Sequence, residues 1–165
     1  MRAGASIPPA AAAPGRIRLL QVDSWPSSIS RLISSEMRDN DIKIAIEGTR
    51  GAQLHADLDW NPNDVTIIKK RYSAFFKTEL EDLLEEFGVG ELVLCGINTH
   101  ACIRMAAIGA YQRDLRVVLA EECIDSYNEE HARVSLDYMN GKIAKVAVVA
   151  EVIEALRPSA AGPAQ

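Results

Sequence analysis

The chain has 165 residues, a length that fits one domain with a sizeable buried core. Hydrophobic residues make up 48% of the sequence and charged residues 25%, which is the ordinary balance of a globular protein. The formal net charge is -5, which argues against a nucleic-acid partner, and no apolar run is long enough to cross a bilayer. We therefore expect neither nucleic acid nor a membrane as a partner.

The two ends of the chain differ in composition from its middle. Residues 1–16 are rich in alanine and proline and predict a disordered tail, with an organellar transit peptide as the alternative. Residues 157–165 predict a second tail. A single domain is expected between the two tails, over residues 17–156.

The sequence has three cysteines, namely Cys95, Cys102 and Cys123. So few thiols do not form a disulfide framework, and they fit a reducing cytoplasm in which one thiol can be reactive. We therefore expect a cytoplasmic protein. Cys95 falls within an apolar run and is expected to be buried and inert.

The sequence before residue 70 predicts several short elements. Residues 17–23 predict a strand, residues 27–39 a helix and residues 42–48 another strand. Residues 64–69 (DVTIIK) are short and β-branched, which is typical of a strand.

Residues 77–88 (KTELEDLLEEFG) have leucines at helical spacing and predict a helix. Thr78 and Glu81 have the spacing of a capping box at its start, and Gly88 suits the position just after its end. Residues 91–97 (ELVLCGI) form a continuous apolar run, as expected of a strand that is covered on both faces.

The rest of the chain continues to alternate between helix and strand patterns. Residues 99–114 predict a helix, residues 115–124 a strand, residues 128–139 a helix with Asn128 as N-cap, and residues 143–156 a short strand that leads into a helix. The apolar face of the first of these helices is formed by Ile103, Ala106, Ala107 and Ala110.

This alternation predicts an α/β protein of the Rossmann-like, three-layer kind, with a mostly parallel sheet and helices on both faces. Ligands of such sheets bind beyond the carboxyl ends of the strands. Lys69 ends one predicted strand, and Cys102 follows shortly after another. Both residues are therefore candidates for a site at this edge.

Cys102 falls in the first turn of a predicted helix, where unpaired backbone amides and the helix dipole favour thiolate over thiol. The same amides can bind an oxyanion that forms when a thiolate attacks a carbonyl group. The alternative is a buried thiol that only packs. For Lys69, the alternatives are a cation that stabilises a thiolate and a lysine that merely extends to solvent from the strand end.

Three ordered segments resemble the isochorismatase-like cysteine hydrolases, a superfamily that includes nicotinamidases, N-carbamoylsarcosine amidases and ureidoacrylate-type amidohydrolases. The segments are EGTRGAQLHADL (47–58), IIKKRYSAFFKTELEDLL (67–84) and LVLCGINTHACIRMAAIGAYQRDLRVVLAEECIDSY (92–127). The resemblance covers roughly residues 45–150. Lys69 precedes Cys102 by 33 positions (102 − 69), at the spacing of the family.

The resemblance implies that Cys102 is a nucleophile that forms an acyl-enzyme and that Lys69 stabilises the thiolate and the developing charge. It also implies a cis peptide bond between Ile97 and Asn98, with the amides of Asn98 and Cys102 forming an oxyanion hole. The alternative for Asn98 and Thr99 is an ordinary turn and helix cap.

The third catalytic residue of the family is an aspartate that acts as a base at the end of the first strand. Here Asp23 is the one residue in a similar context. Only 24 positions (47 − 23) separate Asp23 from Glu47, too few for the helix and strand that the family has between them. We favour a second alignment, in which Asp23 lies in a later loop and the first strand, its helix and the catalytic aspartate are absent.

Four further residues are candidates to line a substrate pocket: Tyr72, Phe75, Thr99 and His100. The metal site of some nicotinamidases needs an Asp-x-His arrangement, which this sequence lacks, so we expect no metal and no other cofactor. A sheet without its first strand and helix would expose apolar surface, which favours association. We therefore expect a homo-oligomer.

The sequence leaves three hypotheses for function. The favoured one is a hydrolase that cleaves a C–N bond of a small amide or ureido substrate through a thioester on Cys102. The second is a pseudoenzyme without the catalytic aspartate, which binds a small molecule or pairs with another subunit. The third is an isochorismatase that cleaves a vinyl ether, and it is less favoured because that chemistry does not require the cysteine.

Overall fold

The computed structural model describes residues 17–21, 49–54, 56–58 and 64–157. The predicted helix at 27–39 and the predicted strand at 42–48 lie outside these residues, as do the tail at 1–16 and all of the second tail except Arg157. Among the described residues, no helix has both the length and the apolar character that a membrane span requires.

The chain divides into two compact units, Met1–Lys70 and Arg71–Gln165, and each is described by itself. The first contains the parallel strands β1 (Ile17–Gln21) and β2 (Val65–Lys69) and a short 3-10 turn, η1 (Arg50–Ala52). The register runs from Ile17 opposite Val65 to Gln21 opposite Lys69. The sequence predicted both strands, over residues 17–23 and 64–69.

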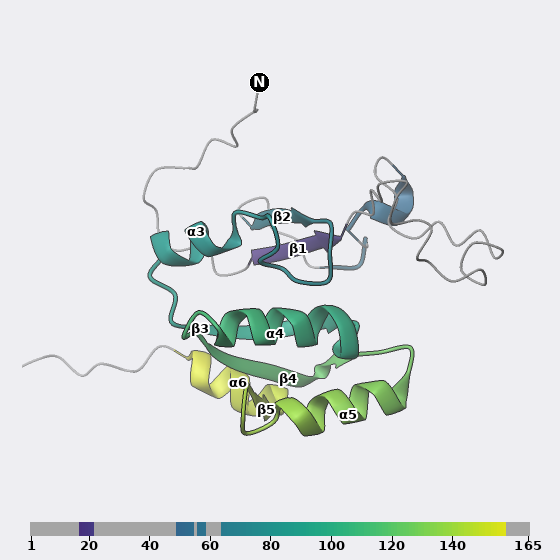
Figure 1. Ribbon diagram of the computed structural model, residues 1–165, viewed down its shortest axis with the longest axis vertical. Coiled ribbons are helices and arrows are strands. Elements are labelled where there is room, and N and C mark those ends of the chain that lie inside the picture. Colours follow the sequence, from purple (N-terminus) through teal and green to yellow (C-terminus); the bar gives the residue numbers. More distant parts are fainter. Residues whose placement is uncertain (1–16, 22–48, 55, 59–63, 158–165) are drawn as a thin grey trace, which may run out of the picture. The chain divides into compact units, whose positions relative to one another are not determined.

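The second unit contains a parallel sheet in the order β3-β4-β5, formed by Glu91–Ile97, Arg116–Asp125 and Lys145–Ala147. Four α-helices accompany it, namely α3 (Leu80–Glu86), α4 (Arg104–Tyr111), α5 (Glu129–Met139) and α6 (Val149–Leu156). Helices α4 and α5 connect successive parallel strands (Figure 1). The predicted α/β, Rossmann-like fold class is confirmed.

Alternate residues of β4 pack on opposite faces of this sheet. Val118 and Ala120 form a cluster with Ala147 of β5 and with Val149 and Val152 of α6. Val117 and Leu119 point to the other face and are also buried. Both faces of β4 are therefore covered, as expected for the central strand of a parallel sheet.

Helix α3 is shorter at its start than the sequence predicted, and the predicted capping box is wrong. Lys77 has a left-handed backbone with φ of 54°, which a helix cannot include. The Thr78 hydroxyl donates to the Ala74 carbonyl and accepts from the amide of Leu80, the first residue of α3, so it joins the preceding loop to the helix start without forming a capping box. The predicted role of Gly88 is confirmed: its φ is 62°, and its amide bonds the Glu85 carbonyl.

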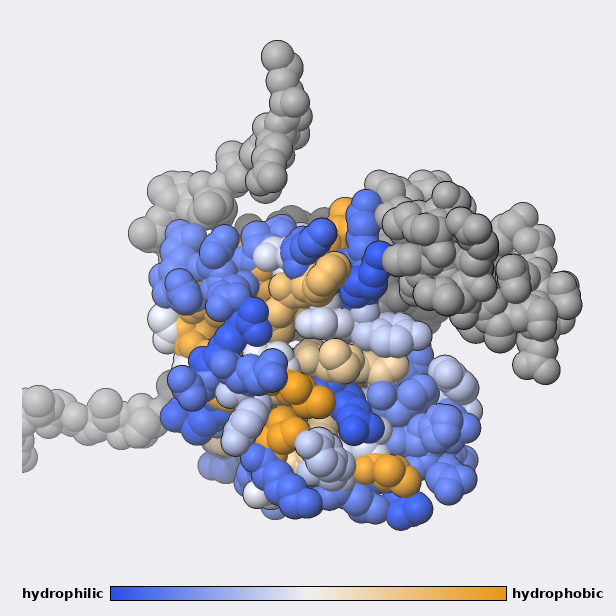
Figure 2. Space-filling view, viewed as in Figure 1, coloured by the Kyte–Doolittle hydropathy of each residue, from blue (hydrophilic) through white to orange (hydrophobic). Residues whose placement is uncertain are grey.

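Strand β3 is more exposed than its apolar sequence predicted. Val93 is 37% exposed and Ile97 is 70% exposed. Within the described part of the chain, β3 pairs with β4 alone, so it is an outer strand of this sheet. In the lower part of Figure 2, apolar residues (orange) lie between hydrophilic ones (blue) on the visible face. The surface of the second unit is therefore mixed in character.

Candidate functional site

Cys102 lies in a single π-helical turn, η2 (Thr99–Ile103), that directly follows β3 and continues into α4. The turn forms because the Ile103 amide bonds the Asn98 carbonyl at 3.1 Å and the Arg104 amide bonds the Thr99 carbonyl. The sequence predicted a helix over residues 99–114; the segment is helical from Thr99, its first turn is π-helical, and the helix ends three residues earlier than predicted, at Tyr111. The predicted apolar face is correct, since Ile103, Ala106, Ala107 and Ala110 are all buried.

The segment that leads into this turn has an unusual backbone. The peptide bond between Ile97 and Asn98 is cis, at the position that the resemblance implied. The Asn98 carbonyl accepts hydrogen bonds from the amides of Ala101 and Ile103, both at 3.1 Å. Cys102 is half-buried within the turn and lies beyond the carboxyl end of β3. A π-helical turn of this kind often occurs at functional sites.

Thr99 anchors the turn to the neighbouring strand. Its side chain is 1% exposed, and its hydroxyl donates a hydrogen bond of 3.0 Å to the main-chain carbonyl of Asp125. Thr99 and Asp125 also border a groove of about 610 Å³ along α5. Thr99 therefore fixes the start of η2 as well as bordering this groove.

His100 connects the same turn to the residues that follow β4. Its Nδ1 atom forms a hydrogen bond with the Ser126 hydroxyl. Its ring meets Tyr127 edge-on at a centroid distance of 5.0 Å and the ring of His131 at 5.4 Å. The sequence interpretation missed Ser126, Tyr127 and His131. The predicted parallel strands could have indicated these residues, because pairing of β3 with β4 brings the carboxyl ends of both strands together.

The two aromatic candidates before α3 have different environments. Phe75 is buried, and a Cβ atom on Gly109 of α4 would lie only 2.7 Å from the Phe75 Cδ2 atom. The Arg113 guanidinium lies over the Phe75 ring at 4.3 Å. Phe75 thus packs against α4, which fits core packing, the alternative to a place in the substrate pocket. Tyr72 is 55% exposed.

Lys69 and Cys102 belong to different units. Lys69 ends β2 in the first unit and is 5% exposed, which is unusual for a lysine. Its register partner is Gln21, the last residue of β1. Asp23 follows that strand and lies outside the described residues.

The other two thiols lie side by side on β3 and β4. Cys95 and Cys123 are both exposed, so the expectation of a buried Cys95 is wrong. The reason is the outer position of β3 in its sheet. Partial burial raises the pKa of the Cys95 thiol, and Cys123 raises this pKa further through its charge and a side-chain hydrogen bond.

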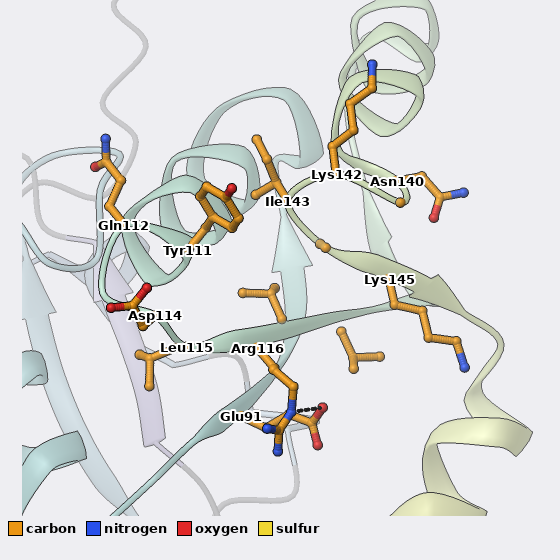
Figure 3. A pocket seen from close by; sticks show the side chains of 14 residues that line it. Glu91, Tyr111, Gln112, Asp114, Leu115, Arg116, Asn140, Lys142, Ile143 and Lys145 are labelled. Carbon is orange, nitrogen blue, oxygen red and sulfur yellow. Dashed lines mark hydrogen bonds and ion pairs between the residues drawn. The ribbon is translucent and has the colours of Figure 1, made fainter.

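A hollow of about 780 Å³ lies at the opposite end of the sheet. Figure 3 shows it bordered by Arg116 and Lys145 at the starts of β4 and β5, and by Tyr111 at the end of α4. It lies at the amino ends of the strands, whereas Cys102 follows a carboxyl end, so it is separate from the candidate site. Within the described residues, no group of three or more metal-ligating side chains comes together.

Comparisons with known proteins agree with this geometry. Residues 26–154 match the family model for the isochorismatase domain. Phenazine biosynthesis protein PhzD1 of Pseudomonas aeruginosa is 34% identical over 93 residues, which are 56% of this chain and 45% of that protein. The chain spans about half the length of the curated relatives it matches.

Solved structures show the same similarity. Nicotinamidase PncA of Bacillus subtilis has a TM-score of 0.66 and 29% identity, and the match covers 81% of this chain and 75% of that chain. An isochorismatase-like hydrolase from Alkaliphilus metalliredigens has a TM-score of 0.73 over 84% of this chain and 71% of that chain. At 24% identity, this second similarity supports the fold alone.

Proposed function

Because this chain belongs to the isochorismatase family, we propose that it is a hydrolase that cleaves a C–N bond of a small amide or ureido compound, with Cys102 as the nucleophile. The observation that carries the proposal is the position of Cys102 in the first helical turn beyond β3. The positive end of the helix dipole at such a turn favours negative charge beside it. The turn can therefore support both a thiolate and an oxyanion.

The proposed reaction has two steps. The Cys102 thiolate attacks the carbonyl carbon, a C–S bond forms, and the C–N bond breaks as ammonia or an amine leaves with a proton from water. Water then attacks the thioester carbon, which releases the acid and restores the thiol. Both steps pass through an oxyanion, for which we propose the amides of Asn98 and Cys102 as donors. The steps use only protein groups and water.

Lys69 is proposed to stabilise the thiolate and the developing negative charge. Its burial supports this role, because a lysine that merely extends to solvent would be exposed. The proton of the Cys102 thiol passes to solvent in this scheme. Asp23 is the alternative acceptor, as in the three-residue arrangement of the family.

The substrate is proposed to lie beside His100 and Thr99 at the start of η2. Ser126 and Tyr127, which follow β4, and His131 of α5 contact the His100 ring, which supports a fixed orientation for a polar contact. Two apolar residues of α6, Ile153 and Leu156, are exposed and support the proposal of a homo-oligomer.

The experiment compares the release of ammonia or amine from nicotinamide, an N-carbamoyl amino acid and a ureido acid by the wild type, Cys102→Ser and Cys123→Ser. We expect turnover of at least one compound by the wild type and Cys123→Ser, and a loss of at least about 100-fold in Cys102→Ser. Cys123→Ser is the matched control, because it makes the same change at a thiol outside the site.

Two results would contradict the proposal. Absence of turnover in the wild type, with Cys102 still reactive toward alkylating reagents, would support the pseudoenzyme hypothesis. Equal turnover by the wild type and Cys102→Ser would assign the chemistry to other groups, as the vinyl-ether hypothesis requires.

A further inference from the structure

We infer that Cys95 and Cys123 form a reversible oxidation site, in which a hydroperoxide converts the two thiols into a disulfide that joins β3 to β4. The inference does not rest on the proposed function, because neither cysteine belongs to the proposed catalytic machinery. It rests on the register of two neighbouring strands and on the exposure of both thiols.

The register places the two cysteines next to each other. Gly96 of β3 pairs with Ile124 of β4, and each cysteine immediately precedes one member of this pair. Cys95 and Cys123 therefore flank the same paired position on two neighbouring strands, and the two side chains interact. Adjacent strands lie about 4.8 Å apart, which falls within the range of about 4.4–6.8 Å between the Cα atoms of a disulfide.

The strand register shifts between Leu94 and Gly96, at the position of Cys95. Between these two residues β3 has only Cys95, whereas β4 has residues 120–123 between their partners, so β4 bulges opposite Cys95 and Cys123 is the last residue of the bulge. The side chains of Cys95 and Cys123 interact with each other, since their hydrogen bond and the charge on Cys123 both affect the Cys95 thiol. Both are also exposed, so a small hydroperoxide can reach them.

The reaction balances with the hydroperoxide as the oxidant. The Cys123 thiolate attacks the peroxide oxygen, an S–O bond forms, and the O–O bond breaks to release water or an alcohol. The Cys95 sulfur then attacks the sulfenic sulfur, an S–S bond forms, and the S–O bond breaks to release water. Two thiols lose two electrons, and the hydroperoxide gains them. Cys95 is assigned the second step because a negative charge on Cys123 opposes its ionisation.

The test treats the reduced wild type, Cys102→Ser, Cys95→Ser and Cys123→Ser with hydrogen peroxide, then counts free thiols and maps tryptic peptides without reduction. Cys102→Ser is the critical variant. Because no lysine or arginine lies between residues 95 and 102, trypsin leaves both cysteines in one peptide, so the wild type alone cannot identify the partner of Cys123.

We expect Cys102→Ser to lose both of its thiols and about 2 Da of mass, and dithiothreitol to restore both; the wild type should lose at least the same two thiols. Cys95→Ser and Cys123→Ser should form no such cross-link. The inference is overturned if Cys102→Ser keeps both thiols or oxidises them beyond the disulfide. It is equally overturned if Cys95→Ser still forms the cross-link, or if the only disulfides join two chains.

Discussion

The hydroxyl of Thr99 donates a hydrogen bond of 3.0 Å to the main-chain carbonyl of Asp125. This bond joins the turn that carries Cys102 to the end of β4, across 26 positions of sequence. Thr99 is 1% exposed, so its hydroxyl has no solvent to replace this acceptor. The bond therefore holds the candidate nucleophile in a fixed relation to the sheet.

We expect Thr99→Val to lower the free energy of unfolding by about 1–3 kcal/mol, because the valine has the same shape but leaves the Asp125 carbonyl without its donor. The measurement is urea-induced unfolding followed by circular dichroism. Thr66→Val makes the same change at an exposed position of β2 and should alter the free energy by less than about 0.5 kcal/mol. Equal effects of the two substitutions would show that the Thr99 bond does not stabilise the fold.

Gly109→Ala is expected to destabilise the second unit by about 1–3 kcal/mol, because its Cβ atom would lie 2.7 Å from the Phe75 ring. Gly90→Ala is the control, since a Cβ atom there has nothing within 4 Å. Urea unfolding of both variants checks the difference. Adding Phe75→Leu to Gly109→Ala should recover part of the loss, and a fully stable Gly109→Ala protein would contradict the packing of Phe75 on α4.

The Cys95 thiol should make stability depend on pH. Its pKa is raised in the folded protein by burial and by Cys123, so the folded state holds this proton at a pH where the unfolded chain releases it. The bound proton of Cys95 contributes fully to the free energy of unfolding below the thiol pKa of the unfolded chain, which is about 8.5. This contribution is lost as the pH rises through the higher pKa of the folded protein. Under reducing conditions, the wild type should therefore lose more stability than Cys95→Ser as pH rises above about 8.5. Equal changes in the free energy of unfolding of the two proteins with pH would contradict this effect.

Asp23→Asn is expected to leave turnover nearly unchanged, because the spacing to Glu47 leaves too little chain for Asp23 to be the family's catalytic aspartate. The rate of amide hydrolysis by this variant and by the wild type gives the comparison. A loss of about 100-fold or more would be the effect of removing a general base. Such a loss would contradict the favoured alignment and assign the base to Asp23.

Helix ends that depend on neighbouring residues were predicted well from the sequence. Gly88 ends α3 with a positive φ, and Asn128 caps α5 by accepting a hydrogen bond of 2.8 Å from the His131 amide. Both depend on residues within one helical turn, which sequence patterns record directly.

The features that the sequence interpretation missed depend on pairing between distant segments. The π-helical turn at Thr99 has no distinctive residue pattern. The contact between His100 and Ser126 requires that β3 and β4 be known neighbours. The burial of Phe75 likewise depends on the packing of its ring against Gly109, which lies 34 positions (109 − 75) further along the chain.

Activation of Cys102 as a nucleophile can be measured by the rate at which iodoacetamide alkylates each cysteine of the reduced protein at neutral pH, followed by peptide mapping in wild type and Cys95→Ser. We predict that Cys102 is alkylated faster than a free model thiol and faster than Cys123. Alkylation of Cys102 no faster than the model thiol would contradict the account.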